Sequence, residues 1–234
     1  MDDKRGARVT AAAVIVAAGS SVRMGGARKP FLELGGRTVL ERSCAAFQRA
    51  SGVRELVIVA REEDLERVRE LGLAVAAVVP GGSERADSVR LGVAAVSRAV
   101  DVICVHDAAR PLIRTETIER AILVAAREGA ALVAVPLRDT VKRSASGRSA
   151  EETLERSQLW AAQTPQCFRM ELLRELLRRA EQDGFRPSDD SALHERYVGP
   201  VPIVEGEATN LKLTTPTDLA IAAAILAERE KELG

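Results

Sequence analysis

The 234-residue sequence has few aromatic residues, no excess charge of either sign and no long apolar run. Aromatic residues make up only 3% of the chain, which leaves little for the stacked rings that hold nucleic-acid bases. The 34 basic side chains balance the 34 acidic ones, and this balance argues against a generally basic face for nucleic acid. We therefore expect no nucleic acid among the partners of this protein.

Cysteine and histidine are also scarce. The three cysteines are scattered and form no CxxC pair, and there are only two histidines. This usage argues against a disulfide framework and against a structural zinc site. The polar start MDDKRGARVT and the short apolar run at 11–18 resemble neither a signal peptide nor a membrane span. We expect a cytoplasmic protein with no membrane partner.

Short apolar runs alternate with longer amphipathic segments along most of the chain. Strands this apolar are buried on both faces, and the alternation is typical of a parallel sheet covered by helices. The sequence therefore predicts an α/β fold whose ligand lies where the strands end. The expected strands are 13–18, 55–60, 74–79, 101–105 and 131–136, and the expected helices are 38–49, 62–71, 84–99, 115–127 and 217–231.

One polar segment, 138–156, interrupts this pattern. It is either a solvated surface loop or a hairpin arm that leaves the domain and packs on another subunit. A structureless loop of this length is uncommon inside a domain, which favours the arm. We interpret 1–234 as a single domain with 138–156 as an excursion.

The loop after the first expected strand, Ala17 to Pro30, carries glycines and cations but no acid. Glycines let backbone N–H groups approach a phosphate, and cations such as Arg23 and Lys29 neutralise its charge. The spacing matches neither a Walker A loop nor the dinucleotide fingerprint GxGxxG. We interpret the loop as a triphosphate cradle; the alternative is an ordinary loop with incidental basic residues.

This loop and five later segments resemble a known family. AAGSSVRMGGARKPFLELGGRTVLE is similar to the opening signature of sugar-nucleotide pyrophosphorylases and cytidylyltransferases. GGSERADSV, VHDAARPL, RDTVKR, QTPQCF and NLKLTTPTDL follow in order, and together they resemble the 2-C-methyl-D-erythritol 4-phosphate cytidylyltransferases of the non-mevalonate isoprenoid pathway. The resemblance implies a Rossmann-like nucleotidyltransferase fold and a β-arm that makes a homodimer.

The implied reaction transfers CMP from CTP to methylerythritol phosphate and releases pyrophosphate. Both reactants are anionic, so positioned cations and Mg²⁺ suffice, and no covalent intermediate is needed. The resemblance assigns catalysis to Arg23, Lys29, Arg156 and Lys212. Lys212 lies in the apolar-flanked NLKLT, and a lysine in a buried strand is costly unless it meets an anion.

Asp107 follows the fourth expected strand and is the candidate Mg²⁺ ligand, since Mg²⁺ takes few carboxylates plus phosphate oxygens. The alternative makes Asp107 a turn cap with Arg110 as its ion-pair partner. His106 is interpreted as structural, because an ionised phosphate needs no deprotonation.

The family resemblance assigns the remaining candidate residues to substrate contacts. The cytidine of CTP would be bound by Gly82, Ser83 and Ser88. The alternative makes Gly81-Gly82 a turn and Ser83 the N-cap of the next helix. The other substrate-binding candidates are Ala17, Ala18, Gly19, Ala108, Arg110, Thr164 and Ser188, with Thr140 and Arg156 reaching the site of the neighbouring subunit. Two positions depart from the family pattern, Ser21 for a glycine and Ser188 for a threonine.

Two other functions compete with this interpretation. A cytidylyltransferase for another polyol phosphate, such as ribitol 5-phosphate, would share the loop and the Mg²⁺ residue. A regulatory nucleotide-binding module without turnover would be expected to lose Lys29, Asp107 or Lys212, and all three are present.

Overall fold

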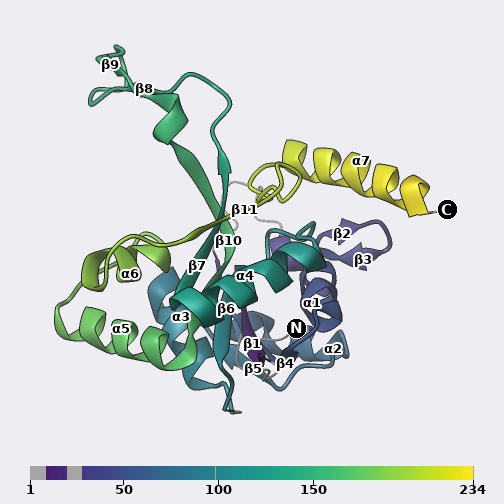
Figure 1. Ribbon diagram of the computed structural model, residues 1–234. Coiled ribbons are helices and arrows are strands. Elements are labelled where there is room, and N and C mark those ends of the chain that lie inside the picture. The colour runs from purple at the N-terminus through teal and green to yellow at the C-terminus, as the bar shows by residue number, and fades with distance from the viewer. Residues whose placement is uncertain (1–8, 20–27, 98, 234) are drawn as a thin grey trace.

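The computed structural model describes residues 9–19, 28–97 and 99–233. Within this part of the chain, seven strands form one central sheet in the order β11-β7-β10-β6-β1-β4-β5 (Figure 1). Neighbouring strands are parallel except β10, which is antiparallel to both β6 and β7. The predicted, mostly parallel sheet is therefore confirmed. The strands are β1 (Ala11–Val16), β4 (Val53–Ala60), β5 (Ala77–Pro80), β6 (Val102–Asp107), β7 (Ala130–Pro136), β10 (Trp160–Arg169) and β11 (Ile203–Glu205).

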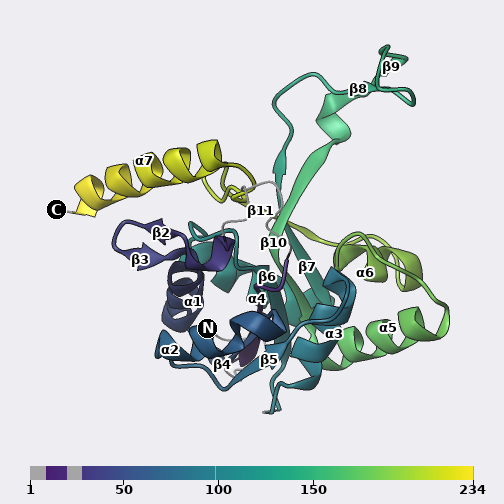
Figure 2. The same ribbon diagram turned by 180° about the vertical axis from the view of Figure 1, so that it is seen from behind.

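Helices cover both faces of this sheet, as Figures 1 and 2 show from opposite sides. Side chains of β1 alternate between two apolar clusters: Ala13 and Ile15 pack with α1, α2 and α4, while Ala12 and Val14 pack with α3, α5 and α6. The strand is therefore apolar at every position because both of its faces are buried. The helices are α1 (Val39–Arg49), α2 (Leu65–Glu70), α3 (Arg85–Ala94), α4 (Thr115–Glu128), α5 (Met170–Gln182), α6 (Ser191–Tyr197) and α7 (Pro216–Leu233).

The C-terminal helix α7 lies apart from the two main layers, beside the short hairpin of β2 (Glu33–Leu34) and β3 (Arg37–Thr38) (Figure 1). A small separate cluster joins Leu34, Leu213 and Ala222 there. No helix among the described residues combines the length and the apolar character needed to span a membrane.

The segment 138–156 is an arm between β7 and β10 that projects from the sheet (Figures 1 and 2). Two short strands, β8 (Lys142–Arg143) and β9 (Glu152–Thr153), pair antiparallel within it. The hairpin interpretation is confirmed, whereas packing on another subunit and the single-domain boundary stay predictions. Because the chain leaves along β7 and returns along β10, these two strands run side by side in opposite directions.

The structure differs from the sequence prediction in several elements. The helix expected over 84–99 ends at Ala94, and Ser97 donates its backbone N–H to the Glu55 carboxylate at 2.8 Å, which turns the chain toward β6. β6 continues through Asp107 rather than ending at Val105. Apart from the strand expected around Lys212, no elements are predicted between 157 and 214, although the amphipathic spacing of α5 is a clear helix signal.

Candidate active site

A cavity of about 700 Å³ lies at the carboxyl ends of β1, β4, β5 and β6. Loops from all four strands line it, together with the turn at Lys29–Phe31 and the segment that precedes α7. This is the sheet edge at which open α/β folds bind ligands. The predicted site residues on its wall are Ala17, Ala18, Gly19, Lys29, Gly82, Ser83, Ser88, Asp107, Ala108 and Lys212.

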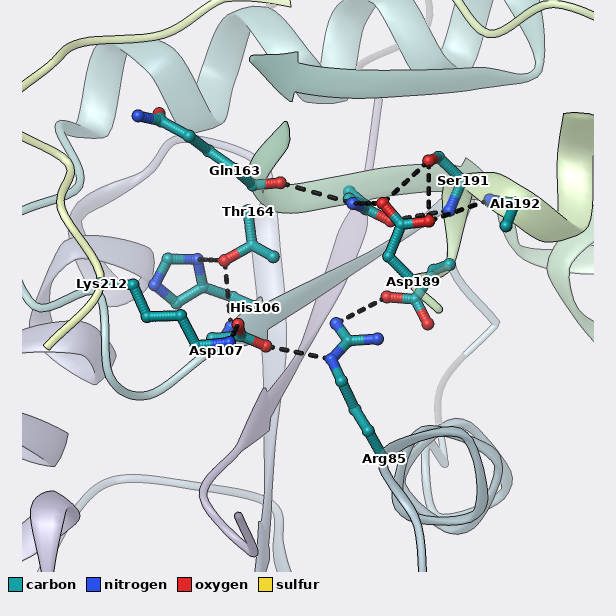
Figure 3. A network of polar contacts seen from close by, with 11 residues as sticks. Arg85, His106, Asp107, Gln163, Thr164, Asp189, Ser191, Ala192 and Lys212 are labelled. Atoms are coloured by element: carbon teal, nitrogen blue, oxygen red, sulfur yellow. Dashed lines mark hydrogen bonds and ion pairs between the residues drawn. The ribbon is translucent and has the colours of Figure 1, made fainter. Parts of the chain in front are cut away.

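Asp107 is the last residue of β6 and faces two cations (Figure 3). Lys212 Nζ lies 2.6 Å from Asp107 Oδ2, and Arg85 Nε lies 3.2 Å from Asp107 Oδ1. Although burial opposes ionisation, the charges of Arg85 and then Lys212 hold the pKa of Asp107 well below its usual range. An ionised carboxylate therefore stands at the cavity wall.

Arg85 bridges this carboxylate to a second one. It is the first residue of α3, and its Nη2 donates to Asp190 Oδ2 at 2.8 Å. Burial raises the pKa of Asp190, while Arg85 counteracts that rise. Sequence reasoning missed Arg85 as a site residue, although it lies inside the motif GGSERADSV and on the cavity wall.

Lys212 occupies a different structural setting from the predicted one. The prediction of a buried strand is wrong: Lys212 lies in the irregular segment between β11 and α7, with 43% of its side chain exposed. The Leu213 N–H donates to Ala109 O at 2.8 Å, which holds this segment beside the end of β6. Lys212 does meet an anion, and in this structure that anion is Asp107.

The Arg110 guanidinium bonds to backbone carbonyls and forms no ion pair with Asp107. The alternative of an Asp107–Arg110 ion pair is wrong, because Asp107 pairs with Arg85 and Lys212 instead. The Arg110 guanidinium donates to Asn210 O at 2.8 Å and to Ala162 O at 3.3 Å. These bonds tie the segment before Lys212 to β10. A substrate contact by Arg110 stays a prediction.

His106 and Thr164 form a buried support behind Asp107 (Figure 3). Thr164 Oγ1 accepts the Asp107 N–H at 3.1 Å and lies 3.0 Å from His106 Nδ1, so its hydroxyl proton is available to that ring nitrogen. His106 Nε2 lies 3.2 Å from Arg110 O, the geometry of a ring N–H donating to a carbonyl. Burial lowers the pKa of His106 to about 4, which leaves a neutral ring consistent with the structural interpretation.

Tight packing shapes the wall assigned to cytidine. A Cβ built on Gly81 would lie 2.4 Å from Ala18 Cβ, and one on Gly82 would lie 2.2 Å from Asp87 Cβ. The Gly82 N–H donates to Ser88 Oγ at 3.1 Å. Only glycine fits these two positions without a shift of the wall.

Ser83 is not the N-cap of α3. That alternative is wrong, because the cap residue is Glu84, and the Ser83 hydroxyl donates to Asp87 Oδ2 at 2.8 Å. The bond holds Ser83 on the first turn of the helix, at the cavity wall. Its contact with cytidine stays a prediction.

Both flanks of the predicted phosphate loop are tied to the segment after β4. Arg61 donates to Ala18 O at 3.4 Å and to Gly19 O at 3.2 Å. On the other flank, Arg28 pairs with Asp64 at 2.8 Å, so its charge is already compensated. Arg23 falls within 20–27 and lies outside the described residues. Arg61 could have been found from its position directly after an expected strand.

The candidates for the second substrate do not line the cavity of their own chain. Thr140 and Arg156 are exposed on the arm, where Arg156 donates to Arg138 O. Ser188 is exposed between α5 and α6, and Thr164 is buried behind Asp107. The fold thus separates the arm residues from the cavity of the same chain.

Comparison with known proteins places this geometry in a family. The IspD family model, described as 2-C-methyl-D-erythritol 4-phosphate cytidylyltransferase, matches residues 11–228. The cytidylyltransferase of that name from Geobacillus kaustophilus is 41% identical over 227 residues, covering 94% of this chain and 98% of the relative. The one from Symbiobacterium thermophilum is 41% identical, with 97% of each chain covered.

Solved structures agree with the sequence matches. The 4-diphosphocytidyl-2C-methyl-D-erythritol synthase from Anaerococcus prevotii superposes with a TM-score of 0.82 at 28% identity, covering 94% of this chain and 96% of the other. The cytidylyltransferase from Thermus thermophilus superposes with a TM-score of 0.75 at 32% identity, covering 94% and 100%. The chain therefore belongs to the 2-C-methyl-D-erythritol 4-phosphate cytidylyltransferase family.

Proposed function

We propose that this chain transfers the cytidylyl group of CTP to the phosphate of 2-C-methyl-D-erythritol 4-phosphate. The observation that carries the proposal is the cavity wall, on which Arg85 and Lys212 pair with the ionised Asp107 and to which Lys29 adds a further cation. Family membership supplies the identity of the two substrates. Both substrates are charged phosphate esters. We propose that the protein acts in the cytoplasm.

The chemistry is an in-line displacement at phosphorus. A phosphate oxygen of the acceptor attacks the α-phosphorus of CTP, one P–O bond forms, and the bond to pyrophosphate breaks. Lys29 and Lys212 would stabilise negative charge on the triphosphate and on the crowded transition state. Neutral, buried His106 takes no proton, because the attacking oxygen is already ionised. Arg23 is proposed to assist from the phosphate loop.

The residues of the cavity wall are suited to holding a Mg²⁺ ion that binds together with CTP. Asp107 is ionised and faces the cavity, and Mg²⁺ is commonly held by one or two carboxylates plus substrate phosphates. Among the described residues, no group of three His, Cys, Asp or Glu side chains is placed to hold an ion unaided. Asp107 would hold Mg²⁺, which supplies charge neutralisation on the triphosphate. Metal binding should therefore depend on CTP.

The arm is proposed to complete the acceptor site of a second copy. It is exposed along most of its length and carries Thr140 and Arg156 away from the cavity of its own chain. At its base lies Trp160, the single tryptophan, with 39% of its surface exposed. Exposed aromatic residues are typical anchors of protein interfaces. Arg110, Thr164 and Ser188 are the proposed contributions of the home subunit.

Pyrophosphate release tests the activity directly. The purified chain is incubated with CTP, Mg²⁺ and one acceptor at a time: methylerythritol phosphate, ribitol 5-phosphate, or none. We expect turnover with methylerythritol phosphate. Turnover with ribitol 5-phosphate alone would refute the acceptor assignment, and no turnover with either would indicate a nucleotide-binding module.

Subunit mixing tests the shared site. Arg156→Ala and Lys29→Ala chains are each expected to be nearly inactive as homodimers. A mixed dimer has one site with both residues intact, so exchange should restore part of the activity. Trp160 emission on dilution reports the dimer itself, and no rescue in confirmed heterodimers would refute a shared site.

A further inference from the structure

Four charged side chains form a continuous row from the cavity into the interior. Lys212 pairs with Asp107, Asp107 with Arg85, and Arg85 with Asp190. The row holds two positive and two negative groups, so its charges compensate. Its inner end, Asp190, has 2% of its side chain exposed and is not on the cavity wall. Asp190 can therefore reach a substrate only through Arg85.

The position of Asp190 is set by its neighbours at the start of α6. Asp189 accepts hydrogen bonds from Ser191 Oγ at 3.0 Å and from the Ala192 N–H at 3.1 Å (Figure 3). Gln166 of β10 donates to Asp189 at 2.8 Å and accepts the Ser191 N–H at 2.7 Å. These bonds fasten the beginning of α6 to β10.

Strand β10 also holds the other side of Asp107. Thr164 accepts the Asp107 backbone N–H, as described above. One antiparallel strand thus sets the backbone of Asp107 directly and sets its carboxylate indirectly through Asp190 and Arg85. Two independent supports from the same strand leave the carboxylate little freedom to rotate.

Arginine suits the middle of this row better than lysine. Its guanidinium uses Nε for Asp107 and Nη2 for Asp190, two donors fixed in one plane. A lysine ammonium is a single point charge on a flexible stem and does not reproduce this fork. Asp190 in turn draws part of the Arg85 charge away from Asp107, which leaves that carboxylate able to bind a cation.

We propose that Arg85 and Asp190 are positioning residues, which orient the Asp107 carboxylate and keep it available to the cation that accompanies CTP. This inference rests on the proposed role of Asp107. Arg85 acts through Asp107, and Asp190 acts through Arg85.

Steady-state kinetics on Asp190→Asn, Arg85→Gln and the double variant test the proposal. A displacement of the carboxylate by about 1 Å can cost on the order of 10²-fold in rate, so Asp190→Asn should lower kcat by about that factor. The KM for CTP should change less than about twofold. The double variant should be no slower than Arg85→Gln, because both changes interrupt the same row. Arg90→Gln, on the same helix and paired with Glu181 on the surface, is the matched control and should keep the wild-type kcat.

Binding measurements separate positioning from mere structural support. Mg²⁺ affinity in the presence of a non-hydrolysable CTP analogue, measured by titration calorimetry, should fall about tenfold in Asp190→Asn. An unchanged kcat and Mg²⁺ affinity in Asp190→Asn, with only the melting temperature lowered, would overturn the proposal. A raised KM for CTP in Arg85→Gln alone would overturn it too, and make Arg85 a substrate-binding residue.

Two further variants keep the test decisive. If Asp190→Asn does not fold, Arg85→Lys takes its place, since it keeps the charge but loses the fork; a wild-type kcat in Arg85→Lys would overturn the proposal. Wild-type turnover together with its loss in Asp107→Asn tests the proposed function separately. Inactive wild-type protein therefore refutes the function, whereas active wild type with an unaffected Asp190→Asn refutes only the positioning role.

Discussion

Replacing Gly81 by alanine should damage nucleotide binding through a single methyl group. The new Cβ would lie 2.4 Å from Ala18 Cβ and 2.8 Å from Ser88 Oγ. The first contact is 1.0 Å short of the 3.4 Å at which ordinary van der Waals contact begins. The Gly81 N–H donates to Ala60 O at 2.7 Å, which holds the backbone of Gly81 in place. The wall at Ala18 must therefore move by about 1 Å.

A shift of this size is large for a binding wall. Misplacement by 1 Å can cost on the order of 10²-fold in rate, and overpacking typically costs about 1–3 kcal/mol of unfolding free energy. We expect Gly81→Ala to lower kcat/KM for CTP by about 10²-fold, measured by pyrophosphate release at varied CTP. Urea unfolding of the same variant measures the stability change separately.

A second substitution checks the cause. Ala18→Gly removes the methyl group that the new Cβ would strike, so the double variant Gly81→Ala with Ala18→Gly should recover much of the lost kcat/KM. Ser88 can rotate its hydroxyl away, and it limits recovery less than Ala18 does. A Gly81→Ala protein with wild-type kcat/KM would refute this reasoning, as would a double variant no better than the single one.

Three further changes probe other parts of the fold. Lys212→Met removes a cation from the cavity wall and should lower kcat by roughly 10²–10³-fold in the pyrophosphate assay, and a full rate would exclude Lys212 from catalysis. Hydrogen bonds from Thr214 lower the pKa of Asp218 from 3.8 to about 2, so this carboxylate stabilises the start of α7 above pH 4 and loses that effect as the pH falls through about 2. Asp218→Asn should lower the free energy of unfolding by roughly 1 kcal/mol at pH 7, after allowance for solvent screening. Urea unfolding at pH 3 should show a smaller difference from wild type, and an equal difference at both pH values would contradict the assignment. Gly92→Ala would place a Cβ 2.4 Å from Val14 Cγ1 and should lower the free energy of unfolding by about 1–3 kcal/mol. The melting temperature should fall accordingly, and an unchanged melting temperature would show that α3 can move off the sheet.

Local sequence signals predicted the parts of the fold that follow repetitive physical rules. Buried parallel strands need apolar residues at every position, so β1, β4, β6 and β7 were found close to their observed limits. The length of the polar segment 138–156 favours a hairpin arm over a structureless loop, and the structure has the hairpin. Strand β10 and its antiparallel direction were both missed, and the direction depends on how the chain returns from the arm.

The candidate active site likewise contains residues that the sequence predicts and residues that it does not reveal. The family resemblance points to Lys29 and Lys212, and the place of Asp107 at the end of a strand points to that carboxylate. The structure brings all three to one cavity wall, and their roles stay predictions. Arg85 and Arg61 were missed, although both lie on the cavity wall. Their roles depend on which carboxylate or carbonyl lies opposite, and that partner is distant in the sequence.

The sequence by itself determined the α/β alternation, because buried strands and amphipathic helices leave local patterns of apolar residues. Six motifs in order also showed the resemblance to the family, which implied the chemistry of the site. Only the tertiary structure decided the partners of each charge. In the folded chain, Arg110 donates to backbone carbonyls and Lys212 pairs with Asp107. Arg85 pairs with Asp190, which lies 105 positions away in the sequence. Coulomb attraction and burial act over a few ångströms in space, so residues far apart along the chain meet only after the sheet has assembled.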